Sequence, residues 1–142
     1  MRWASSISTE PLLPDALGAC EATLRAEMDG LAPDLVVVFA DVAYDCQVDS
    51  LAEVVAERFP GAAVLGCTGA GVIGGGKEIE TAPALSLTVA HLPGVELSPF
   101  HLNESVLPSP DDPPDAWEDL AGAPAAAGPH FILLADPFTV DG

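Results

Sequence analysis

The chain has 142 residues, of which 4 are Lys or Arg and 22 are Asp or Glu, so its formal net charge is −18. Hydrophobic residues make up 49% of it, which excludes intrinsic disorder, a state that combines high net charge with low hydrophobicity. Four scattered cations cannot form the basic face that a nucleic acid requires, and the acidic surface repels an anionic membrane. We therefore expect neither partner, and interpret the charge as an aid to solubility in a salty cytoplasm or as an acidic docking surface.

The length fits a single domain. The longest uncharged apolar runs are far shorter than the roughly 20 residues that span a bilayer, and the N-terminus lacks the apolar stretch of a signal peptide. The three cysteines have no CxxC spacing and lie far from the histidines, which predicts free thiols and no metal. We expect a cytoplasmic protein.

The first half of the chain alternates between strand and helix patterns. Residues 3–8 form a short strand pattern, and residues 14–28 carry apolar side chains at spacings of three and four, which predicts a helix. Residues 35–40 are an unbroken apolar run, typical of a strand covered on both faces. After a polar loop at 41–49, Asp49 and Ser50 can cap a helix at 51–59, and a third strand follows at 63–66.

The second half departs from this rhythm. Residues 66–76 hold six glycines, and we expect a turn or surface hairpin at 74–76. Residues 84–92 and 95–102 flank a Pro-Gly pair and predict an antiparallel hairpin. Residues 130–135 predict a last buried strand, after which the chain ends before a crossover helix could follow.

These patterns predict an α/β fold with a mixed, largely parallel sheet, crossover helices and an antiparallel hairpin near 84–102. Six side chains are expected in the core, and they come from two helices and two strands: Leu17, Leu24, Val37, Leu51, Val55 and Leu133.

Polar and glycine residues follow the predicted strands where each strand ends. Asp41 follows the strand at 35–40, Cys67 and Thr68 follow the strand at 63–66, and Asp136 follows the strand at 130–135. Since open α/β sheets bind ligands outside the carboxyl ends of their strands, we expect these groups to share one edge. Carboxylates there could meet a ligand ammonium group, and the glycine-rich loop could offer backbone N–H groups to its carboxylate. The same groups could instead only cap loops.

The glycine-rich segment also spells GxGxxG at 69–74, the pattern of a dinucleotide site. No helical face follows it, so no cofactor is expected. At its start, we expect at least one residue of 66–71 to adopt a positive φ, because the chain must turn sharply there.

Four segments of the chain resemble the N-terminal FIST domain of F-box and intracellular signal transduction proteins. The most specific is the string Leu65-Gly66-Cys67-Thr68-Gly69-Ala70-Gly71-Val72-Ile73, and the others are Pro33–Phe39, Arg58–Ala62 and Leu133–Phe138. The string keeps Gly66, Cys67, Ala70, Gly71 and Ile73 of the family pattern. It has Thr68 for Ser, Gly69 for Thr and Val72 for Glu. The resemblance covers the front part of such a domain, so residues 1–142 are expected to be a partial one, truncated at the C-terminal end.

The resemblance implies a cytoplasmic sensory module that binds a small ligand, such as an amino acid, and works beside a FIST C-terminal domain or a signalling output domain. We therefore expect ligand binding without catalysis, at Asp41, Gly66, Cys67, Thr68, Gly69, Gly71 and Asp136. Two alternatives stay open: an enzyme that uses Cys67 as nucleophile or Asp41 and Asp136 as metal ligands, and a pure protein-interaction scaffold.

Overall fold

The computed structural model describes residues 1–102, 107–109 and 111–135. The chain divides into two compact units, Met1–Leu97 and Ser98–Gly142. The first unit holds the sheet and its two helices, and the second holds the short helix α3 (Pro114–Ala121) and a 3₁₀ turn at Ala125–Ala127. No helix among the described residues is long and apolar enough to cross a membrane.

The first unit is built on a four-stranded mixed sheet in the order β1-β6-β2-β3. Its strands are β1 (Arg2–Ser8), β2 (Leu35–Asp41), β3 (Ala63–Gly69) and β6 (Leu85–His91). β2 and β3 are parallel, with Asp41 opposite Gly69, whereas β6 runs antiparallel to both β1 and β2. The expected α/β class with a mixed sheet is confirmed.

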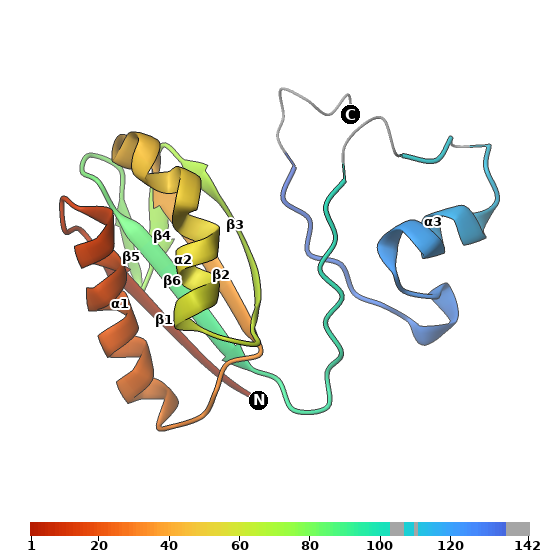
Figure 1. The fold of residues 1–142 in the computed structure, drawn as a ribbon, viewed down its shortest axis with the longest axis horizontal. Helices are drawn as coiled ribbons and strands as arrows, with labels where there is room; N and C mark the ends of the chain where they lie inside the picture. Colours follow the sequence, from red (N-terminus) through yellow and green to blue (C-terminus); the bar gives the residue numbers. More distant parts are fainter. Residues whose placement is uncertain (103–106, 110, 136–142) are drawn as a thin grey trace. The chain divides into compact units, whose positions relative to one another are not determined.

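Both crossover helices cover the same face of this sheet (Figure 1). They are α1 (Leu13–Met28) and α2 (Leu51–Arg58). Side chains of the two helices pack against alternate residues of the strands and form one hydrophobic core. Leu17 and Leu24 of α1 and Val55 of α2 belong to this core, and each is at most 1% exposed. A smaller cluster around Leu35 and Leu92 lies on the opposite face. The helical spacing read from the sequence therefore placed both helices correctly.

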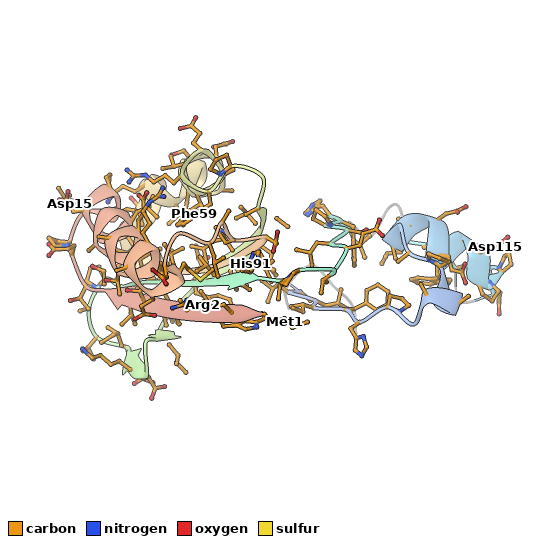
Figure 2. The ribbon with its side chains drawn as sticks, turned by 90° about the horizontal axis from the view of Figure 1, so that it is seen from below. Met1, Arg2, Asp15, Phe59, His91 and Asp115 are labelled. Carbon is orange, nitrogen blue, oxygen red and sulfur yellow. The ribbon has the colours of Figure 1, made fainter. Side chains whose placement is uncertain are left out.

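A two-stranded hairpin, β4 (Val72–Gly74) and β5 (Lys77–Ile79), packs against the face opposite the helices. Figure 2 shows it on the other side of the sheet from Asp15, in α1, and Phe59, at the end of α2. The hydroxyl of Ser86 in β6 donates a hydrogen bond to the carbonyl of Ile73 in β4 at 2.8 Å. The hairpin thus buries Ser86, which is 2% exposed.

The hairpin expected at 84–102 is wrong in its second half. Within residues 84–92, Leu85–His91 forms β6, and Gly94 has a φ of +80° in the expected turn, but residues 95–102 form no strand. β6 already pairs on both edges, with β1 and with β2, so a returning strand has no edge left to join. Pro99 in that stretch also lacks the backbone N–H that a ladder requires.

The last buried strand expected at 130–135 is also wrong. Residues 131–135 have no strand structure, and Leu133, expected in the core, is 66% exposed. The described part of Ser98–Gly142 contains no other strand with which this segment could form a ladder. Of the other expected core residues, Leu17, Leu24, Leu51 and Val55 are buried and Val37 is partly buried.

The segment after β2 differs from the polar loop expected there. Val42–Ser50 forms two short 3₁₀ turns with a kink at Asp45, whose φ is +48°. α2 begins at Leu51 as expected, but the side chain of Ser50 makes no capping hydrogen bond. The two turns carry Tyr44 into the core, where it is fully buried.

Candidate ligand site at the ends of β2 and β3

The structure brings most of the expected site residues together. β3 is longer than expected and continues through Gly66, Cys67 and Thr68 to Gly69, whose partner in β2 is Asp41. Gly71 lies in the turn between β3 and β4. Asp136 lies outside the described residues, so its expected place at this edge stays a prediction.

Asp41 is less available to a ligand than the sequence suggested. The residue is 5% exposed, and its Oδ1 accepts a hydrogen bond of 2.8 Å from the backbone N–H of Ala43. This contact caps the 3₁₀ turn that follows β2, because the side chain satisfies a backbone donor that has no partner within the turn. The structural role that the sequence left open as the alternative therefore accounts for one of the carboxylate oxygens.

Gly66 has a steric reason to be glycine. A Cβ at this position would overlap the carbonyl oxygen of Val38 in the neighbouring strand. No residue of 66–71 has a positive φ, so the expectation of a left-handed residue there is wrong. The chain leaves β3 without needing that conformation, and the positive φ angles fall instead in the next turn, at Gly75 and Gly76.

Cys67 and Thr68 are both exposed on β3, an edge strand of the sheet. Cys67 is a free thiol. It pairs in register with Phe39, whose partner in β6 is Ser86. His91 is at the opposite end of β6, where its Nδ1 lies 3.0 Å from the carbonyl oxygen of Ala32 and 3.3 Å from Asp34. Within the first unit, the thiol therefore has no histidine beside it.

A cavity of about 460 Å³ opens directly after β3, and we call it the hairpin cavity. Its lining comes from the turn after β3 and from both strands of the hairpin: Ala70, Gly71, Val72, Ile73, Glu78 and Glu80. Both carboxylates are exposed, and no ion pair involves either of them in the described part of the chain. The lining therefore combines two carboxylates with apolar side chains and the backbone of a glycine-rich turn.

Sequence reasoning missed Glu78 and Glu80 as site residues. The sequence signal that could have indicated them was the Gly75-Gly76 pair, because this dipeptide is favoured in the two-residue loops of β-hairpins. The register of that hairpin, with Ile73 opposite Glu78 and Val72 opposite Ile79, brings the two carboxylates beside the turn that carries Gly71. The hairpin also means that the GxGxxG string at 69–74 leads into a strand and not into a helix.

The described residues contain no group of three or more His, Cys, Asp or Glu side chains that could hold a metal ion. Two carboxylates can attract a cationic group, and exposed backbone at a glycine-rich turn can accept or donate hydrogen bonds. Two carboxylates and exposed backbone are thus the polar groups that the cavity offers.

Residues 34–142 match the FIST N domain family. The chain belongs to this family. Two proteins of Mycobacterium tuberculosis, "Uncharacterized protein MT0656" of strain CDC 1551 / Oshkosh and "Uncharacterized protein Rv0628c" of strain ATCC 25618 / H37Rv, are each 36% identical to it over 104 residues. The match covers 72% of this chain and 26% of each relative, so the chain spans about a quarter of their length. No solved structure matches it.

Membership of the FIST N family connects this chain with a sensory role in signal transduction. All the residues that line the hairpin cavity, in the turn after β3 and in the glycine-rich hairpin, fall within the matched region. The string at residues 65–73, which resembles the family pattern, thus lies at the edge of the sheet where the candidate site is.

Proposed function

We propose that this FIST N domain is a sensory domain that binds a small ligand with an ammonium group, an amino acid being the first candidate, and does so without catalysis. The observation that carries the proposal is the hairpin cavity, which Glu78 and Glu80 line together with Ala70 and Gly71 of the turn. The carboxylates hold the ammonium group, and backbone N–H groups of the turn receive the ligand carboxylate. Cys67, Thr68 and Gly69 extend this site along the end of β3.

The output of such a sensor is a second domain. The relatives are about four times as long as the matched region, which leaves room for a FIST C-terminal domain or a signalling output domain. The free thiols of Cys20 and Cys67 suit a reducing compartment and support the cytoplasmic location that forms part of this proposal.

Ligand binding is tested by thermal shift and calorimetric titration against the common amino acids, with the matching amines and carboxylic acids as controls. We expect at least one amino acid to bind, and Glu78→Gln and Glu80→Gln each to weaken binding about tenfold, as expected for losing a charge-assisted contact. Glu57→Gln, on the exposed face of α2, removes the same charge elsewhere and should leave the affinity unchanged. Unchanged affinity in both hairpin variants, or no binding by any amino acid, would exclude this site.

The same titration shows how far the ligand reaches along the sheet. Cys67→Ala and Asp41→Asn should weaken binding if the ligand extends to the ends of β3 and β2. If only the two glutamate variants have an effect, the site is confined to the hairpin.

The enzyme alternative makes a different prediction for Cys67. A nucleophilic cysteine has a lowered thiol pKa and reacts quickly with iodoacetamide near neutral pH. We expect Cys67 to react no faster than the cysteine of an unstructured peptide, measured by mass spectrometry of the peptide that carries it. A rate well above that reference would favour the enzyme over the sensor.

A further inference from the structure

A second cavity, of about 340 Å³, lies between the C-terminal ends of α1 and α2. Its lining includes Pro33, which stands just before β2, so it adjoins the opposite end of that strand from the candidate ligand site. We call it the arginine pocket, because Arg25 of α1 and Arg58 of α2 both line it.

The floor of the arginine pocket is apolar. Leu24 and Met28 of α1, Val89 of β6 and Phe59 after α2 line it, and none of them is more than 5% exposed. These side chains belong to the main core, so the floor is held in place by packing that exists without a ligand. An alkyl or aryl group that entered the pocket would therefore lie over this packed layer and against Leu31, which lines the pocket and is 39% exposed.

The wall of the pocket is cationic in a chain of net charge −18. Arg25 and Arg58 are two of its four Lys and Arg residues. Arg25 lies 5.9 Å from the centre of the Phe59 ring, over its face. Both guanidinium groups bind Glu21: Arg25 through Nε at 2.8 Å and Nη2 at 2.7 Å, and Arg58 through Nη1 at 2.5 Å.

Glu21 holds the two arginines but leaves part of each free. Burial by itself raises the pKa of Glu21, but hydrogen bonds from Arg58 and Arg25 and their positive charges more than offset this and lower the pKa below its ordinary value. The carboxylate is therefore charged, and the three groups together carry one positive charge. Within the described residues, Nη1 of Arg25 and Nε and Nη2 of Arg58 have no hydrogen-bond acceptor.

We propose that the arginine pocket binds a small amphiphilic carboxylate, with its alkyl or aryl tail on the apolar floor and its carboxylate on the free donors of Arg25 and Arg58. The single excess charge at the wall matches a monoanion. This site is independent of the hairpin cavity, whose carboxylates repel the same ligand.

The test titrates the intact chain with octanoate and compares it with octan-1-ol and octylamine, which share the tail but carry no charge or a positive one. We expect octanoate to bind at least about tenfold more tightly than octan-1-ol and octylamine to bind least, because only the carboxylate can accept hydrogen bonds from the guanidinium groups. Backbone amide shifts in two-dimensional NMR should concentrate at Leu24–Leu31 and Phe59. Equal affinity for octanoate and octan-1-ol, or shifts centred elsewhere, would overturn the proposal.

Variants of the residues at the wall of the pocket should change the affinity for octanoate in opposite directions. Arg58→Gln should weaken octanoate binding about tenfold, whereas Arg58→Lys, which keeps the charge, should weaken it less. Lys77→Gln removes an exposed cation in β5, which does not line the pocket, and should have no effect. Since Arg58→Gln also loosens the contact with Glu21 and could impair folding, Glu21→Gln is the second measurement. It removes the competing carboxylate and should tighten octanoate binding, and weaker or unchanged binding in Glu21→Gln would overturn the proposal.

Discussion

Two residues in this structure owe their identity to neighbours that are distant in the sequence. Gly66 has no room for a side chain beside Val38, in the strand next to it. Tyr44 is fully buried although it lies in a stretch with three aspartates, and its hydroxyl donates a 2.8 Å hydrogen bond to the carbonyl of Glu10. At the scale of single residues, the sequence predicted that Gly66 is needed for a turn, and it gave no indication that Tyr44 is buried.

Gly66 provides the first prediction. Gly66→Ala should destabilise the protein by about 2 kcal/mol or more, because the added methyl group overlaps backbone that belongs to a paired strand. Gly18→Ala is the matched control: a Cβ there meets nothing within 4 Å, and the position is inside α1. That variant should stabilise by about 0.5–1 kcal/mol, since alanine is the better helix former. Urea unfolding of the two variants should therefore give changes of opposite sign, and a neutral Gly66→Ala would disprove the steric argument.

The hydroxyl of Tyr44 and the thiol of Cys20 are buried, and their pKa values predict how the free energy of unfolding changes at alkaline pH. Burial, followed by the nearby charges of Cys20, Asp41 and Glu10, raises the pKa of Tyr44 to about 12. Burial likewise raises the pKa of Cys20, although a hydrogen bond with Ser6 partly opposes it. Both groups ionise more readily in the unfolded chain, so the folded state binds more protons and loses stability as pH rises above their ordinary values.

We therefore expect the free energy of unfolding, from urea titrations, to fall steadily from pH 9 toward pH 12. Tyr44→Phe cannot ionise and should show a shallower decline, even though the loss of its hydrogen bond lowers its stability at neutral pH by about 1 kcal/mol. An equally steep decline in this variant would show that Tyr44 does not contribute.

At the scale of elements, local patterns predicted α1, α2, β1 and β2 well, because their apolar side chains repeat at the period of the element. The failures concern strands and their partners: residues 95–102 and 130–135 form no strand, and the pairing of β6 and of the glycine-rich hairpin was not predicted. β6 inserts between β1 and β2, and the hairpin of β4 and β5 covers the opposite face of the sheet from the helices. A strand is only defined by its partner, and the partners here are up to 89 residues apart, as in the pair Arg2 and His91.

The packing of α1 provides a prediction at this scale. Leu24 is fully buried between the helix and the sheet, whereas Leu12, at the N-cap of the same helix, is 55% exposed. Leu24→Ala should cost about 2–5 kcal/mol through lost burial and the cavity left behind. Leu12→Ala removes the same atoms from a solvated position and should change stability by less than about 0.5 kcal/mol. Similar losses for the two variants in chemical denaturation would contradict the observed orientation of α1.

At the scale of the whole molecule, the dominant feature is the net charge of −18. In the described part of the chain, the cationic partners in ion pairs are Arg2, Arg25, Arg58 and His91. Most of the acidic side chains in that part therefore have no cationic partner. Repulsion among such exposed charges opposes the compact state, and salt screens it over a distance of about 10 Å at 0.1 M.

We therefore expect the melting temperature to rise as sodium chloride increases toward about 0.5 M, with most of the rise at low concentration, as screening predicts. Potassium chloride should act equally, because screening does not depend on the identity of the cation. A melting temperature that falls with salt would mean that the few ion pairs, including those of Glu21, outweigh the general repulsion.

The sequence by itself determined the α/β class, the position of the helices, the glycine-rich turn and the family, because each is written in local periodicity or in a short string such as residues 65–73. It also placed Asp41 and Cys67 near one edge, through the rule that parallel strands end together. Only the tertiary structure decided that β6 occupies the centre of the sheet, that Asp41 caps a turn, and that Glu78 and Glu80 border a cavity. The physical reason is the same in each case: which backbone edge is free, and which carboxylate is already hydrogen-bonded, depends on neighbours that no local pattern in the chain specifies.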